Sequence, residues 1–188
     1  MPIYKESGLA ISLADDNYFR FCECITYRKL SGSYLREIDF GWWDAEESYL
    51  YLMELTDFSS LTPDEQLADN FLNEVILRTV DCLLMLSAIW SRSRKGQNLQ
   101  ADITQTCISF PSELCKIKIV VVIKIESRHS RTWLSPLLTL LRARIKSKAS
   151  LLDIDFKNDI LLLNHEVAKR LGLPIDYENE IERIDRNV

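Results

Sequence analysis

Glycine, proline and histidine are scarce in this chain of 188 residues, which has five glycines, five prolines and two histidines. So few glycines exclude a phosphate-cradling loop, and the chain has no P-loop, dinucleotide fingerprint or G-x-S-x-G motif. His129 and His165 alone offer little for a histidine-based metal or nucleophile site. The scarcity also excludes a long linker, so we expect one domain over residues 1–175 and a charged tail over residues 176–188.

The five cysteines form no C-x-x-C pair, which excludes a zinc ribbon and a thioredoxin-like site. Buried thiols in a reducing compartment are the expected use of these residues. No uncharged run reaches about 18 residues, and the N-terminus lacks the apolar core of a signal peptide. These features predict a cytoplasmic protein without a membrane partner.

Charge is unevenly distributed along the chain, although the net charge is only −5. Residues 1–88 contain 6 basic and 16 acidic side chains, whereas residues 89–152 contain 12 basic and 3 acidic ones. The basic middle segment predicts contact with nucleic acid. An alternative interpretation is a solvated face, or a counterpart for the chain's own acidic tail. The densest basic positions are Arg92, Arg94, Lys95, Arg142, Arg144, Lys146 and Lys148.

A β-hairpin that carries two carboxylates is predicted between residues 34 and 57. Tyr, Trp, Leu and Ile dominate its two strands, and the polar run 45–48 between them predicts a four-residue loop. If Asp44 and Tyr49 close the ladder, Asp39 lies directly opposite Glu54 on one face, with Cβ atoms about 5 Å apart. Two carboxylates at this spacing repel unless a cation lies between them, and oxygen ligands suit Mg²⁺ or Mn²⁺. The alternative is an exposed acidic pair on a solvated face.

Other elements follow from periodicity. Alternation predicts a first strand over 18–28 and a fourth, central strand over 116–126. A capping box at Thr62 predicts a long helix to about Trp90, followed by a basic loop over 91–105. A helix over 133–148, a strand over 160–163 and a short helix from His165, capped by Asn164, complete the prediction. Trp42 and Trp43 alternate across the hairpin, so one is expected in the core and the other against a base or a partner.

Three antiparallel strands, a long helix and a further central strand, with Asp39 on the second strand and Glu54-Leu-Thr56 on the third, resemble the PD-(D/E)xK nuclease superfamily. The resemblance covers residues 18–126 and implies an α/β, restriction-endonuclease-like core. It implies that Asp39, Glu54 and the Leu55 carbonyl coordinate Mg²⁺ or Mn²⁺. Thr56 stands where the family usually has a lysine that stabilises charge on the phosphate. Lys116, Lys118 and Lys124 on the fourth strand are candidates to replace it, Lys124 first.

The resulting hypothesis is a metal-dependent nuclease that hydrolyses phosphodiester bonds of DNA, with Asp39, Glu54, Thr56 and Lys124 as the catalytic positions. The alternative hypothesis is a catalytically inactive relative that binds nucleic acid or protein, as a homodimer or within a larger complex. Activity with Mn²⁺ distinguishes the two.

Overall fold

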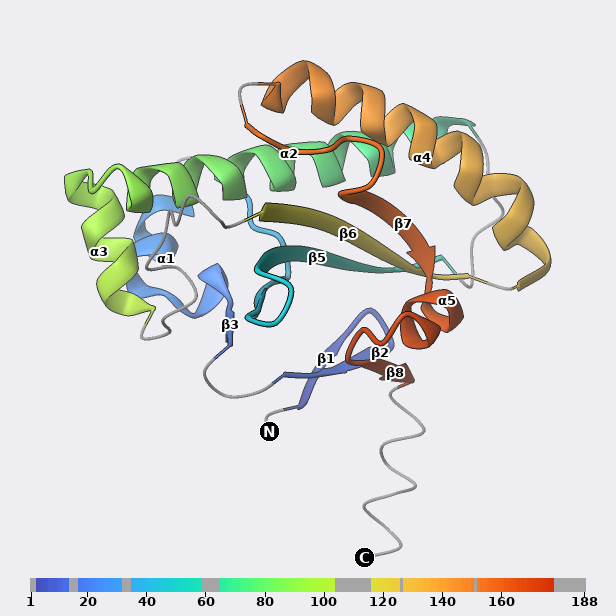
Figure 1. Cartoon of the computed structure of the whole chain (residues 1–188), viewed down its shortest axis with the longest axis horizontal. Helices are drawn as coiled ribbons and strands as arrows, with labels where there is room; N and C mark the ends of the chain where they lie inside the picture. The colour runs from blue at the N-terminus through green and yellow to red at the C-terminus, as the bar shows by residue number, and fades with distance from the viewer. Residues whose placement is uncertain are drawn as a thin grey trace, which may run out of the picture.

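The protein is an α/β protein built on a mixed sheet of five strands, as the computed structural model shows (Figure 1). The structure describes residues 3–13, 17–31, 35–58, 65–103, 116–125, 127–150 and 152–177. The predicted cap at Thr62 and the tail beyond residue 177 lie outside the described residues.

The five-stranded sheet has the strand order β3-β4-β5-β6-β7. Its first three strands are antiparallel neighbours, whereas β5, β6 and β7 run parallel to one another. The parallel strands are linked by helices, as parallel connections require. The bounds of the strands are β3 Tyr18–Phe19, β4 Phe40–Asp44, β5 Tyr49–Asp57, β6 Lys116–Lys124 and β7 Ile160–Asn164.

Two layers cover this sheet, one on each face (Figure 1). The helices α2 (Glu65–Trp90) and α4 (Ser127–Ala149) pack on one face and contribute most of the larger hydrophobic core. A small sheet of order β1-β2-β8 and the helix α5 (His165–Arg170) pack on the other face. The strands of the small sheet are β1 Ile3–Glu6, β2 Leu9–Ser12 and β8 Ile175–Tyr177.

Three shorter helices complete the described chain. A 3₁₀ turn, η1 (Phe21–Glu23), leads into α1 (Ile25–Ser31), and α3 (Arg94–Asp102) follows α2 directly. The helices α1 and α3 lie at one end of the molecule, at the left of Figure 1. No helix in the described part of the chain has the length and apolar character needed to cross a membrane.

Several predictions from sequence are confirmed. The strand β5 spans Tyr49–Asp57 as predicted, and Phe40 pairs with Met53 in the predicted hairpin register. The strand β6 is central, since it lies between β5 and β7. Asn164 caps α5, because its side chain accepts a hydrogen bond from the Val167 N–H. The long helix α2 ends at Trp90, and α4 and β7 cover the segments predicted for them.

Other predictions are wrong. The alternating segment 18–28 forms a strand only at Tyr18–Phe19 and continues as η1 and α1. The second strand begins at Phe40 rather than near residue 34. The basic segment 91–105 contains the helix α3 rather than a loop throughout. The predicted tail begins too early, because β8 pairs with β2 through Ile175, Asp176 and Tyr177.

Candidate functional site

Asp39 and Glu54 lie opposite each other at the open end of the β4–β5 hairpin. Asp39 is one residue before the first residue of β4, and continuing the register from Phe40 and Met53 pairs it with Glu54. Glu54 points to the face of the sheet that α2 covers, because its neighbours Leu50 and Leu52 belong to the core on that face. Both side chains are largely buried, with exposed fractions of 11% for Asp39 and 6% for Glu54.

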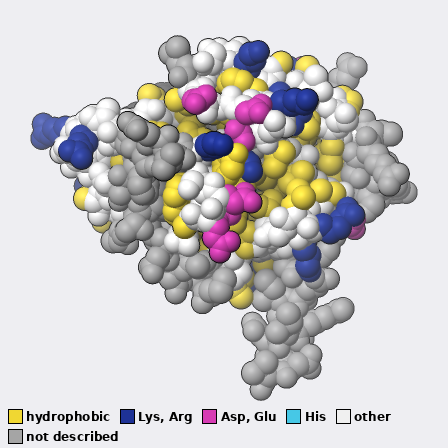
Figure 2. All heavy atoms as spheres, in the orientation of Figure 1, with side chains coloured by type: hydrophobic (Ala, Val, Ile, Leu, Met, Phe, Trp, Pro, Cys, Tyr) yellow, Lys and Arg dark blue, Asp and Glu magenta, His cyan; other side chains and the backbone are white. Residues whose placement is uncertain are grey.

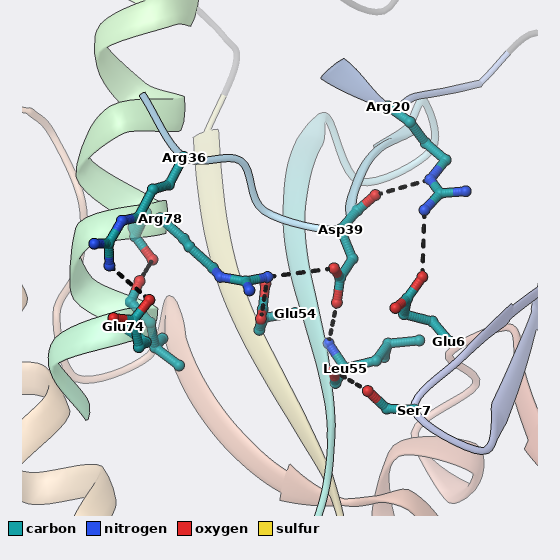
Figure 3. A network of polar contacts seen from close by, with 11 residues as sticks. Glu6, Ser7, Arg20, Arg36, Asp39, Glu54, Leu55, Glu74 and Arg78 are labelled. Atoms are coloured by element: carbon teal, nitrogen blue, oxygen red, sulfur yellow. Dashed lines mark hydrogen bonds and ion pairs between the residues drawn. The ribbon is translucent and has the colours of Figure 1, made fainter. Parts of the chain in front are cut away.

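Hydrogen bonds hold Asp39 from two directions (Figure 3). Its Oδ2 accepts a hydrogen bond of 2.8 Å from the Leu55 N–H. Its main-chain oxygen accepts a bond of 3.2 Å from Nε of Arg20, whose guanidinium also contacts Glu6 at 3.4 Å. The Asp39 carboxylate is therefore fixed against the strand that carries Glu54.

One nitrogen of Arg78 lies between the two carboxylates (Figure 3). Its Nη1 donates to Oε1 of Glu54 at 2.9 Å and lies 3.6 Å from Oδ1 of Asp39. Arg78 comes from α2, and its side chain is 37% exposed. The acid pair thus has a cation from the chain itself where the sequence predicted a metal ion.

The environment favours protonation of both acids. Burial raises the pKa of Glu54 to about 8, the charge of Asp39 adds to this increase, and the Arg78 charge opposes it. Burial likewise raises the pKa of Asp39 to about 6, against the opposing hydrogen bond from the Leu55 N–H. Oε2 of Glu54 is buried without a hydrogen-bond partner among the described residues. The contact with Arg78 therefore leaves one buried carboxylate oxygen of the pair without a hydrogen bond among the described residues.

The residues present fit a divalent ion that keeps much of its own hydration. Mg²⁺ is commonly held by only one or two carboxylates, with waters and substrate oxygens as its other ligands. The described residues contain no group of three or more His, Cys, Asp or Glu side chains that could hold a metal. The Leu55 carbonyl, the predicted third ligand, accepts a hydrogen bond of 3.0 Å from the Ser7 hydroxyl. Asp39 and Glu54 are therefore the side chains that would hold the ion.

The structure separates Thr56 from Lys124. Thr56 is on the same face of β5 as Glu54 and is partly exposed. Lys124 is on the opposite face, because Val120 and Val122 belong to the core against the small sheet. Its Nζ contacts Oδ2 of Asp57 at 3.1 Å. This geometry corrects the prediction that Lys124 supplies the missing charge.

The same alternation places the other two candidate lysines of β6 on the face away from the acid pair. Lys116 and Lys118 share the face of Lys124, and Nζ of Lys118 lies 3.8 Å from the centroid of the Tyr49 ring. Trp42 is on this face too and packs against Tyr51, with 4.8 Å between ring centroids. Trp42, Tyr51 and Lys118 line a surface cavity of about 280 Å³. This cavity is therefore across the sheet from the acid pair.

The predicted basic positions fall into two groups with different surroundings. Arg142 donates two hydrogen bonds to the Ile160 carbonyl, and Arg144 pairs with Asp69 at 2.6 Å. These two side chains connect α4 to β7 and to α2, whereas Lys146 and Lys148 are exposed. Of the predicted cluster on α4, Lys146 and Lys148 are therefore the two members that the structure leaves exposed.

The second basic group is remote from the acid pair along α2. Arg92, Arg94 and Lys95 are exposed around the start of α3, and Lys and Arg side chains are visible at that end of the molecule in Figure 2. From Arg78 to Trp90, α2 extends roughly 18 Å at a rise of about 1.5 Å per residue. A nucleic acid that contacts both regions has to cross this length of helix.

Sequence reasoning missed Arg78, although a signal for it exists. Arg78 is the one basic residue between Arg36 and Arg92, and it follows Val75 by three positions and precedes Cys82 by four. Val75 and Cys82 are both buried, so Arg78 lies on the apolar face of α2. A lone arginine on such a face needs a buried partner, and this one has two.

Comparison with protein-family models, with curated proteins and with solved structures finds no match for this chain.

Proposed function

We propose that this domain has a restriction-endonuclease-like core and hydrolyses phosphodiester bonds of DNA at the Asp39–Glu54 pair. In support, β3, β4, β5, α2, β6 and α4 occur in the order that the resemblance implies, although η1 and α1 are inserted before β4 and α3 before β6. The observation that carries the proposal is the acid pair itself. Two facing carboxylates are buried with raised pKa values, and Oε2 of Glu54 has no partner among the described residues.

A soluble protein rarely keeps such an arrangement without a use for it, since burying carboxylates that lack full compensation costs stability. A divalent ion at the pair would neutralise charge on the phosphate and lower the pKa of a bound water. Glu54 and Asp39 would hold this ion, with the Leu55 N–H and Arg20 fixing Asp39. The Ser7 hydroxyl holds the Leu55 carbonyl and so stiffens the same strand end.

The reaction is a displacement at phosphorus. An oxygen of water bonds to phosphorus as the bond from phosphorus to one sugar oxygen breaks. The water loses a proton to solvent and the leaving oxygen takes one up, which gives a phosphate monoester and a free hydroxyl. The chain's own contribution is orientation and charge, because phosphoryl transfer depends chiefly on positioning and electrostatic stabilisation.

The proposal is tested with purified protein, linear and single-stranded DNA, and Mg²⁺ or Mn²⁺. Asp39→Asn and Glu54→Gln should each reduce cleavage by about a hundredfold or more, because either change removes a ligand of the ion. Glu74→Gln is the matched control, since Glu74 is an exposed carboxylate on α2 that pairs with Arg36. Cleavage that survives in Asp39→Asn and Glu54→Gln would overturn the assignment.

Three observations favour a second function, that of an inactive nuclease-like subunit that binds nucleic acid or protein. Thr56 cannot supply positive charge, the lysines of β6 are on the other face, and Arg78 already neutralises part of the pair. In this case the wild type would bind DNA or a protein partner equally well with and without Mn²⁺ and would cut no substrate.

A further inference from the structure

Arg78 stands between the acid pair and the solvent. Its side chain is 37% exposed, whereas Asp39 and Glu54 are 11% and 6% exposed. A single nitrogen, Nη1, contacts both carboxylates. The other two guanidinium nitrogens carry three of its five N–H groups.

The position of this nitrogen conflicts with a metal ion at the pair. Nη1 is 2.9 Å from Oε1 of Glu54 and 3.6 Å from Oδ1 of Asp39. A divalent ion bound by both carboxylates would come within a few ångströms of the guanidinium, and two cations at that distance repel strongly in a partly buried site. The arginine and the ion therefore compete for the same oxygens.

Among the described residues, β5 and β6 place no lysine on the face of the sheet that carries the acid pair. Thr56 is uncharged, and Lys116, Lys118 and Lys124 are on the opposite face of the sheet. Arg78 is on the correct face and reaches it from α2 on a long, partly exposed stem. A guanidinium presents a planar fork of donors that matches two phosphate oxygens.

We infer that Arg78 is an exchangeable cation, which occupies the acid pair when no metal is bound and turns outward to bind the scissile phosphate when a divalent ion replaces it. Arg78 thereby takes the part of the absent lysine. This inference rests on the proposed function, because it requires that the acid pair binds metal. Arg78 would then have a catalytic role although it lies on α2, outside the positions Asp39 and Glu54-Leu-Thr56.

The experiment measures metal affinity and DNA cleavage in the same variants. Arg78→Met keeps the length of the stem and its packing but removes the charge, whereas Arg78→Lys keeps a charge without the fork. Binding of Ca²⁺ and Mn²⁺ is measured by calorimetry at about pH 9, where protons compete least for the carboxylates. Arg36→Met is the matched control, because Arg36 pairs with Glu74 of α2 at 2.6 Å (Figure 3).

The two readouts should move in opposite directions. In Arg78→Met we expect metal affinity to rise about tenfold, since the competing cation is gone, while cleavage falls about a hundredfold or more. Arg78→Lys should bind metal with nearly wild-type affinity and retain part of the cleavage activity. A purely structural arginine would not raise metal affinity on its removal.

The outcomes separate this inference from the proposed function. Metal affinity that is equal in wild type and Arg78→Met, or cleavage that is unchanged in Arg78→Met, would contradict the exchange of Arg78 for the metal ion. Either result would be compatible with a metal site at Asp39 and Glu54. Absence of metal binding in the wild type and in both Arg78 variants would overturn the proposed function and the inference together. If Arg78→Met fails to fold, Arg78→Lys decides: wild-type cleavage by that variant would contradict the need for the fork.

Discussion

Glu54 and Arg78 are joined by a short ion pair of 2.9 Å, yet the pKa of Glu54 is still raised. Burial and the adjacent charge of Asp39 outweigh the opposing effect of the Arg78 charge on this pKa. Of the two facing acids, Glu54 therefore has the larger increase in pKa, and its protonation links the stability of the fold to pH.

The first prediction concerns this linkage in metal-free protein. The folded-state pKa of Glu54 is about 8 against an ordinary value of 4.5, so its contribution to stability is lost as the pH rises between these values. Glu54→Gln removes the ionisation and should gain about 1–3 kcal/mol relative to wild type between pH 5 and pH 9. Urea denaturation at the two pH values measures this difference. Glu74→Gln should show no such gain, and a parallel pH dependence in Glu54→Gln and wild type would contradict the burial of an uncompensated acid.

The second prediction concerns Lys124. Because this residue contacts Asp57 on the face away from Glu54, Lys124→Met should leave the rate of DNA cleavage within about twofold of wild type. Its partly exposed ion pair should contribute no more than about 1 kcal/mol to the free energy of unfolding. Cleavage kinetics and thermal denaturation provide the two measurements. A cleavage rate that falls a hundredfold in a folded Lys124→Met variant would show that Lys124 contributes to catalysis.

The hairpin that positions the acids could largely be predicted from sequence. Its strands have strong β-propensity and its loop is polar and short, so local rules determine the register and with it the placement of Asp39 opposite Glu54. Asn164 is another local signal, since the cap and the N–H that it binds are three residues apart.

The segments that were predicted wrongly depend on contacts between distant parts of the chain. The backbone N–H of Thr26, in the first turn of α1, donates to the Asp102 carboxylate at the end of α3, 76 residues away. No local pattern reveals such a cap, and the alternation of residues 18–28 favoured a strand instead. The helix α3 lies in the basic segment that was predicted as a loop, although Ser93 caps it by accepting a hydrogen bond from the Gly96 N–H.

The packing of α3 against α2 explains why residue 96 is a glycine. A Cβ on Gly96 would lie 1.9 Å from the Ala88 carbonyl oxygen, so the close approach of α3 to α2 requires glycine inside a helix. Arg78 could not be placed for a related reason. Its helical face is visible in the sequence, but its partners on β5 and before β4 are known only once the sheet is assembled.

The third prediction tests how β3 is held on the sheet. The Phe19 ring lies directly over Gly41, where an added Cβ would come within 2.1 Å of ring carbons. Gly41→Ala should therefore displace Phe19 and lower the free energy of unfolding by about 1–3 kcal/mol. Denaturation of the single variant gives the cost. The double change Gly41→Ala with Phe19→Leu should cost less than the two single changes combined, and additive costs would contradict direct packing.

The fourth prediction divides the basic residues of α4. Lys146 and Lys148 are exposed, so changing both to glutamate should weaken DNA binding at every sequence and flatten its salt dependence by about 0.9 per lost phosphate contact. Arg144→Ala should instead lower stability, because Arg144 pairs with Asp69 and contacts Asn73. Fluorescence titration at several salt concentrations separates the effects. Unchanged DNA affinity in the double lysine variant would assign these lysines to a solvated face.

The most direct measurement for the central claim is calorimetric titration of Mg²⁺ and Mn²⁺ into wild type, Asp39→Asn, Glu54→Gln and the control Glu74→Gln between pH 6 and pH 9. Protonation of the pair competes with the ion, so the wild-type affinity should rise with pH, by up to about tenfold per unit, and level off above the Glu54 pKa of about 8. Glu74→Gln should behave as wild type, whereas Asp39→Asn and Glu54→Gln should bind at least about tenfold more weakly. Equal binding by wild type and both acid-pair variants, or no binding by wild type at pH 9, would contradict a metal site at Asp39 and Glu54.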